Sequence, residues 1–216
     1  MKTALIPKFE HVVARKERSK LILRRKITVL LMLFIALILS GCTENITDIV
    51  TKEKIKVIEN PDSSLKKVKV RTDGMLSEVG YSHPHPFGMG NEVLVDLKYY
   101  EQHNISRGDI VVFKTKNKKD QDTDIARVVG LPGETVRIKK GQVYINDNKL
   151  DAFYGNDTPS NNSDSWNAVT LKENEYYILA DVRWRGFNDS QTAGAFLKHE
   201  VLGKVVGYEN PGIFQK

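Results

Sequence analysis

Cysteine and histidine can carry nucleophilic and metal chemistry, and this chain has one cysteine and five histidines. The single cysteine, Cys42, allows no internal disulfide and no cysteine-based metal site. His83 and His85 alternate with prolines, which predicts an exposed loop, and no two histidines have the spacing of a metal protease. The sequence therefore predicts neither a metal nor another cofactor.

Four further stretches have the residue types of a known set of motifs, in the same order along the chain. They are Arg-Gly-Asp-Ile-Val-Val-Phe at 107–113, Asp-Ile-Ala-Arg-Val-Val-Gly-Leu-Pro-Gly-Glu at 124–134, Gly-Gln-Val-Tyr-Ile-Asn at 141–146, and Tyr-Ile-Leu-Ala-Asp-Val-Arg at 177–183 with Asn-Asp-Ser at 188–190. Together they resemble type I signal peptidases, the serine–lysine endopeptidases that remove signal peptides from exported proteins. The resemblance covers about residues 68–208.

The resemblance implies a specific chemistry. A serine hydroxyl is a poor nucleophile until a base takes its proton, and in this family the base is a buried, neutral lysine. The substrate is an extended peptide with Ala-x-Ala-like residues, which pairs with exposed strand edges. The family's lysine comes directly before the arginine of the second stretch. That arginine is Arg127 here, and the residue before it is Ala126, which predicts that catalysis is impaired.

The serine of the family lies in a Ser-Met-x-Pro motif, for which two placements compete. Spacing favours Ser82, which precedes Arg107 by 25 residues. Sequence favours Asp-Gly-Met at 73–75, which places Gly74 at the nucleophile position and makes 81–90 an insertion. The sequence leaves both placements open, and Ser82 is the candidate catalytic residue if the protein is active.

The last of the four stretches has lost two family residues, because Ala180 replaces a glycine and Val182 an asparagine. Asp181 and Arg183 remain, and we expect them to form a structural ion pair that holds the closing loop. Three hypotheses follow. The first is a non-catalytic protein that binds extended peptides such as signal peptides, the second an active peptidase with Ser82 and a base other than lysine, and the third a structural lipoprotein. His83, His85 and His103 are the candidates for a replacement base.

The N-terminal segment predicts attachment to a membrane. Arg-Arg-Lys at 24–26 precedes an apolar run of about 13 to 15 residues, shorter than the roughly 20 that span a bilayer. The run ends in Leu-Ser-Gly-Cys at 39–42, which resembles the bacterial lipobox and predicts a lipid on Cys42. An uncleaved N-terminal anchor is the alternative. Both place residues 43–216 on the extracytoplasmic face of the cell membrane.

The charge distribution agrees with this arrangement. Residues 1–41 contain nine Lys and Arg against two acidic residues, whereas residues 42–216 contain 24 against 25. The positive charge therefore belongs to the flank that faces the cytoplasm. A nearly neutral remainder gives no support to nucleic-acid binding.

The elements that must position these motifs are short strands with regular turns. We expect an all-β fold of the signal-peptidase type, with little helix. Residues 1–41 are the basic flank and targeting segment, 42–66 a polar tether that is partly helical over 47–58, and 67–216 the β-domain. Residues 151–168 are expected to be a loop. The expected strands are 68–70, 92–96, 109–113, 125–129, 135–138, 142–145, 175–179 and 203–207.

Overall fold

The computed structural model describes residues 24–29, 46–47, 55–77, 81, 84–117, 122–151 and 165–209. The chain divides into two compact units, Met1–Thr43 and Glu44–Lys216. In the first unit, residues 24–29 form a helix with exposed side chains. The described residues include no helix with the length and apolar character needed to cross a membrane. The predicted lipidation site, Cys42, lies outside the described residues.

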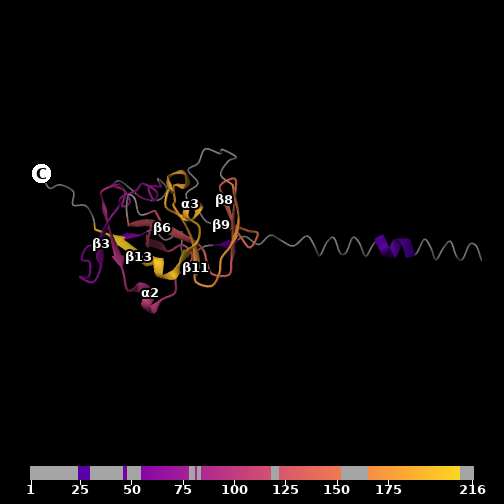
Figure 1. Ribbon diagram of the computed structural model, residues 1–216, viewed down its shortest axis with the longest axis horizontal. Coiled ribbons are helices and arrows are strands. Elements are labelled where there is room, and N and C mark those ends of the chain that lie inside the picture. The colour runs from indigo at the N-terminus through magenta and orange to yellow at the C-terminus, as the bar shows by residue number, and fades with distance from the viewer. Residues whose placement is uncertain are drawn as a thin grey trace, which may run out of the picture. The chain divides into compact units, whose positions relative to one another are not determined.

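The second unit is mainly β, which confirms the predicted fold class (Figure 1). The described helices are all short: α2 (Tyr99–Gln102), α3 (Ser190–Ala193), and the 3-10 turns η2 (Arg183–Arg185) and η3 (Lys198–Glu200). The strands are β1 (Ile46–Thr47), β2 (Lys56–Val57), β3 (Lys66–Lys69), β4 (Glu92–Asp96), β5 (Ile110–Lys114), β6 (Thr123–Gly130), β7 (Thr135–Lys139), β8 (Gln142–Ile145), β9 (Asn148–Asp151), β10 (Trp166–Thr170), β11 (Glu175–Leu179), β12 (Phe196–Leu197) and β13 (Val201–Tyr208).

The larger sheet has the strand order β12-β11-β6-β5-β13-β4-β3, and β2 also pairs with β13. β5 and β6 are apolar and buried along most of their length, as expected for strands covered on both faces. β6 is antiparallel to both of its neighbours, with Ala126 opposite Val111 of β5 and Arg127 opposite Leu179 of β11. The motif with the expected lysine position therefore lies in the middle of this sheet.

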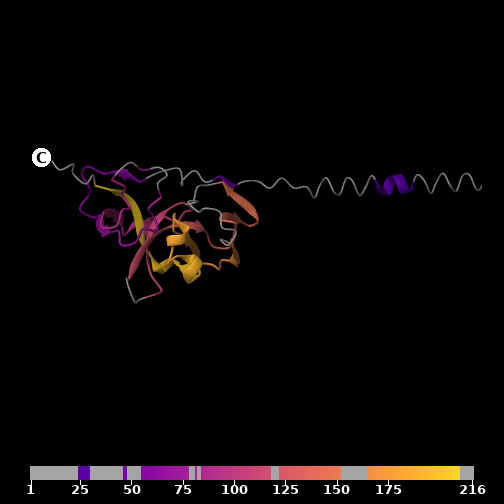
Figure 2. The same cartoon turned by 90° about the horizontal axis from the view of Figure 1, so that it is seen from above.

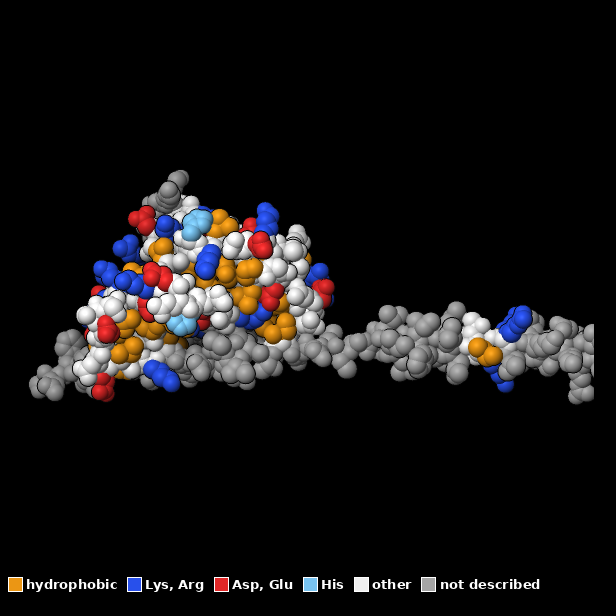
Figure 3. Space-filling model, turned by 90° about the horizontal axis from the view of Figure 1, so that it is seen from below, with side chains coloured by type: hydrophobic (Ala, Val, Ile, Leu, Met, Phe, Trp, Pro, Cys, Tyr) orange, Lys and Arg blue, Asp and Glu red, His pale blue; other side chains and the backbone are white. Residues whose placement is uncertain are grey.

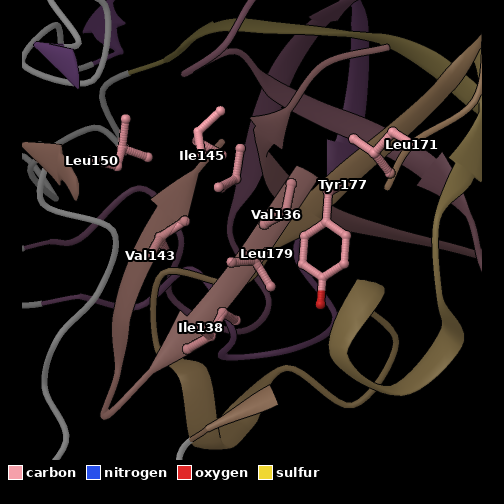
Figure 4. Close-up of a cluster of buried hydrophobic side chains, with 9 residues drawn as sticks. Val136, Ile138, Val143, Ile145, Leu150, Leu171, Tyr177 and Leu179 are labelled. Atoms are coloured by element: carbon pink, nitrogen blue, oxygen red, sulfur yellow. The ribbon is translucent and has the colours of Figure 1, made fainter. Parts of the chain in front are cut away.

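The smaller sheet has the order β1-β9-β8-β7-β10. Lys140 and Gly141 join β7 to β8 with positive φ angles of 51° and 76°, as the tight turn of a twisted hairpin requires. One face of this sheet packs against Tyr177 and Leu179 of β11 in a shared apolar cluster (Figure 4). The smaller sheet and the β3 region lie at opposite ends of the unit in both ribbon views (Figures 1 and 2).

Three expectations about the connecting segments differ from the structure. Parts of the predicted tether are strands, since β1 pairs with β9 and β2 with β13, so Lys56 and Val57 are not helical. β10 begins within the predicted loop, at residues 166–168, because its pairing with β7 is a long-range contact that composition does not reveal. The sequence also predicts a tight turn at Asp147 and Asn148, but the residues with positive φ are Asn146 and Asp147, one position earlier.

Acidic and basic side chains are interspersed on the face of the folded unit drawn in Figure 3, with apolar side chains between them. This agrees with the balance of 24 basic and 25 acidic residues after position 41. Neither sign of charge dominates that face, so it offers no single-sign field to a charged partner.

Candidate active site

Buried charges connect the motifs to one another. Glu134, at the end of the Gly-Leu-Pro-Gly-Glu motif, accepts two hydrogen bonds from the Arg107 guanidinium, at 3.0 and 2.6 Å. Arg107 also donates to the Val129 carbonyl. Within the Gly-Leu-Pro-Gly-Glu motif, the Leu131 N–H donates to the Glu134 carboxylate at 2.8 Å. A bidentate pair of this kind fixes direction as well as distance. The first two motifs thus form one unit.

Each glycine of that motif is required for a different physical reason. A side chain at Gly130 would lie within 3.0 Å of Leu171 and Tyr177 and would also overlap Val136, so only glycine fits between the two sheets. Gly133 has a φ of 81° with open space around it, so its requirement is conformational. The motif is therefore a close crossing of the chain followed by a left-handed turn.

Asp109 of the Arg-Gly-Asp stretch anchors β5 to its surroundings. Its buried carboxylate accepts from the Tyr100 hydroxyl at 2.9 Å and the Ser106 N–H at 3.0 Å, and Lys204 Nζ lies 2.6 Å away. Burial and the Asp109 charge raise the pKa of the Tyr100 hydroxyl. Burial lowers the pKa of Lys204, but the hydrogen bond and charge of Asp109 outweigh it, and the pKa lies above its ordinary value. These charges hold the scaffold together.

Asp181 is held by Arg127, through hydrogen bonds of 2.8 Å from Nε and 2.7 Å from Nη2. Arg127 also donates to the Gly108 carbonyl at 3.0 Å, so the pair ties the end of β11 to β6 and β5. Asp181 and Arg183 are both buried, which agrees with a structural role. Their pairing with each other stays a prediction.

Ala126 occupies the expected lysine position and is 1% exposed. Its side chain belongs to an apolar cluster with Val111 and Phe113 of β5, Ile178 of β11 and Phe196 of β12. The methyl group of Ala126 is therefore packed against hydrocarbon side chains.

Lys116 is the lysine that touches this cluster, and its contacts are structural. Its Nζ lies 4.6 Å from the centre of the Phe196 ring and donates to the carbonyls of Ala193 and Ala195 at 3.2 and 2.6 Å. Lys116 is itself exposed, and its ammonium contacts backbone carbonyls at and just beyond the end of α3.

Gly74 lies against the closing segment after β11. Its carbonyl accepts from the Val182 N–H at 2.8 Å, and a side chain added at Gly74 would lie 3.3 Å from the Ala180 Cβ and 3.4 Å from the Arg185 carbonyl. Ala180 is the first residue after β11 and follows Ile178, a member of the Ala126 cluster, by two residues. Gly74 therefore lies near the end of the strand that pairs with β6 from Arg127 onward.

Ser82 and His83 lie outside the described residues, but their neighbours are visible. Tyr81 packs against the cluster that contains Ile125, and its hydroxyl accepts from the Ile55 N–H at 3.1 Å. Successive residues of a strand point to opposite faces, so Ile125 and Ala126 face different clusters. Tyr81 therefore packs on the face of β6 away from Ala126.

The expectation that His85 is exposed is wrong. His85 is 7% exposed, and its Nε2 donates to the Ser77 carbonyl at 2.7 Å while its Nδ1 accepts from the Phe87 N–H at 3.1 Å. Both ring nitrogens thus bond the backbone of the loop, and the ring contacts those of Tyr81 and Phe87. The prolines indicated the loop correctly, but the hydrogen bonds that bury the ring are tertiary. His103 is exposed and stacks on Tyr99 at 4.3 Å.

Asp189 is a site residue that the sequence reasoning missed. It caps α3 by accepting from the Gln191 N–H, at 2.9 Å, and it accepts from the Ala180 N–H at 3.0 Å. Burial raises the pKa of Asp189 to about 6, although these hydrogen bonds and the Arg183 charge act to lower it. An aspartate followed by a short helix is an N-cap signal that could have identified it.

The described residues hold no group of three or more His, Cys, Asp or Glu side chains arranged for a metal ion. A cavity of about 390 Å³ lies beside the closing segment, lined by Lys116, Asn117, Phe187, Asn188, Thr192 and Ala193.

Comparison with known proteins decides the family. The model described as signal peptidase, peptidase S26, matches residues 77–208. The chain belongs to this family. It is 28% identical over 179 residues to a probable signal peptidase I-2 of Synechocystis sp., covering 75% of this chain and 79% of that protein. It is 31% identical over 119 residues to signal peptidase I S of Bacillus subtilis, covering 51% of this chain and 61% of that protein.

The chain therefore spans about three fifths of the length of the Bacillus relative. A crystal structure of a signal peptidase I from Enterococcus faecalis aligns with a TM-score of 0.41 and 26% identity, over 48% of this chain and 97% of that chain. The four motifs quoted from the sequence fall within the residues that the family model matches. Ser82 also lies within them, whereas Gly74 precedes them.

Proposed function

We propose that this protein is a membrane-tethered member of the signal peptidase family that binds extended peptides without cleaving them. The observation that carries the proposal is Ala126, the residue at the family's base position, closed in an apolar cluster. A methyl group takes no proton, and removing a general base costs ~10²–10⁴-fold in rate. Lys116, the lysine that touches the cluster, is engaged with backbone carbonyls.

The environment of Gly74 supports the same conclusion. Gly74 and Ala180 approach each other beside the end of β11, and neither carries a hydroxyl. This favours the placement in which the nucleophile position is Gly74, so both members of the serine–lysine pair are replaced.

Retention of the scaffold supports a binding role. β11 pairs with β6 from Arg127 onward, so among the described residues Thr123–Ala126 have a strand neighbour on the β5 side alone. A strand edge of this kind accepts an extended peptide by backbone hydrogen bonding. The family's substrates are signal peptides, and we propose these or similar exported segments as ligands. The proposed tether, a lipid on Cys42 or an uncleaved anchor, would hold the domain where they emerge.

The test uses the full-length protein in detergent with a preprotein that carries an Ala-x-Ala cleavage site. Cleavage is followed by gel and binding by co-purification, with the Ser82→Ala variant alongside. We expect binding without cleavage for both proteins. Cleavage by the parent that disappears in Ser82→Ala would overturn the proposal in favour of an active peptidase, the second candidate, which the family match over Ser82 favours. If the protein neither cleaves nor binds the preprotein, the hypothesis of a structural lipoprotein remains.

A further inference from the structure

Asp124 joins three separate segments of the domain through one carboxylate. It lies in β6, two residues before Ala126. Its Oδ1 accepts from the Thr72 hydroxyl at 2.7 Å and from the Ile125 N–H at 2.8 Å, and its Oδ2 accepts from the Asn188 side chain at 2.9 Å. Hydrogen bonds to a charged acceptor are about twice as strong as those between neutral groups.

The segment that contains Thr72 is fastened at the next two residues as well. Asp73 forms an ion pair with Arg185 at 2.7 Å, and the Gly74 carbonyl accepts from Val182. Residues 72–74 are therefore bound to β6 and to the closing segment 182–188 by consecutive contacts.

These contacts lie at the edge where a peptide would pair. Thr123–Ala126 is the part of β6 that β11 leaves uncovered, and Asp124 is within it. With Thr72 and Asn188 both bonded to Asp124, the segments that contain them meet at this edge.

We propose that Asp124 is a latch that holds residues 72–74 and the closing segment together over the β6 edge, and that an extended peptide binds only after the latch opens. The inference rests on the proposed peptide binding and adds its regulation. A ligand that binds only the open state has its apparent affinity reduced by the fraction of molecules that are open. Weakening the latch must therefore tighten binding.

The test compares Asp124→Ala, which removes both side-chain bonds, with Asn188→Ala, which removes one. The control is Asp147→Asn, which removes an exposed carboxylate on the other sheet and suits that residue's φ of 64°. Hydrogen–deuterium exchange reports protection of residues 70–77 and 182–188 without any ligand. Fluorescence anisotropy reports binding of a fluorescein-labelled peptide with an Ala-x-Ala segment.

We expect faster exchange in both segments for Asp124→Ala and about tenfold tighter peptide binding, since two charge-assisted bonds no longer oppose opening. Asn188→Ala should show a smaller change in the same direction, and Asp147→Asn none. Unchanged exchange in a folded Asp124→Ala would overturn the latch. Faster exchange with unchanged affinity would overturn its control of binding. Faster exchange with no peptide bound by any variant would support the latch and overturn the proposed function.

Discussion

At the scale of single residues, two kinds of side chain meet at the candidate site. Asp181 and Asp189 are charged residues that hold backbone and side chains in place, and both are buried. Gly74, Ala126 and Ala180 are the small residues of the candidate site. A fold requires the first kind whether or not it cleaves a bond, whereas the proposed loss of catalysis rests on the second.

Asp189 gives a prediction at this scale. Its folded pKa of about 6 is above the ordinary value of 3.8, so the folded state favours the protonated carboxyl. Its contribution to stability is therefore greatest below pH 3.8 and is lost as the pH rises to about 6. We expect the unfolding free energy of the parent, relative to Asp189→Asn, to fall by about 2 kcal/mol between pH 4 and pH 7. Urea unfolding at several pH values measures this, and a constant difference would contradict it.

At the scale of elements, the strands are held in register by ion pairs between motifs. Arg127 of β6 reaches Asp181 beyond β11, and Arg107 before β5 reaches Glu134 beyond β6. These pairs join the ends of neighbouring strands, where backbone pairing stops. The family motifs are therefore fasteners of a curled sheet as well as markers of a catalytic centre.

The Arg127–Asp181 pair should contribute strongly to stability. Asp181→Ala leaves a buried guanidinium without its carboxylate, and we expect a loss of about 3–5 kcal/mol. Arg137→Ala, which breaks the exposed pair with Asp147, should cost less than about 1 kcal/mol. Chemical denaturation of both variants checks the difference. Equal losses would show that burial does not determine the contribution of these pairs.

The crossing of the two sheets at Gly130 gives a second prediction for elements. Gly130→Ala places a methyl group against Leu171 and Tyr177, with no space to receive it, and we expect a loss of about 1–3 kcal/mol. Gly133→Ala has open space and meets only its unfavourable φ, so about 1 kcal/mol is expected. Thermal unfolding ranks the two. A larger loss for Gly133→Ala would mean that the turn, not the crossing, limits this motif.

At the scale of the whole molecule, a basic flank and apolar run precede a nearly neutral β-domain. That order agrees with a domain held at the outer face of a membrane by its N-terminus. A binding protein at this location would meet exported chains while they are still extended, the form that a strand edge recognises.

Attachment through Cys42 is the prediction at this scale. In bacterial cells fed radiolabelled palmitate, the parent protein should carry label and fractionate with membranes, and Cys42→Ser should lose the label. A parent without label that stays in the membrane fraction would favour the uncleaved anchor. Label that persists in Cys42→Ser would contradict lipidation at this residue.

The sequence by itself determined the family and most of the strands, and it predicted the replacement of the lysine by Ala126. These are local properties, since each motif and each alternating run lies within a few consecutive residues. The sequence left the choice between Ser82 and Gly74 open, because spacing and composition disagreed there.

Only the tertiary structure decided which partners meet. Arg127 is an observed partner of Asp181, and β10 pairs with β7. It also placed Gly74 against Ala180, the residue that follows β11. These outcomes depend on contacts between residues far apart in the chain, whose geometry exists only once the sheets have formed.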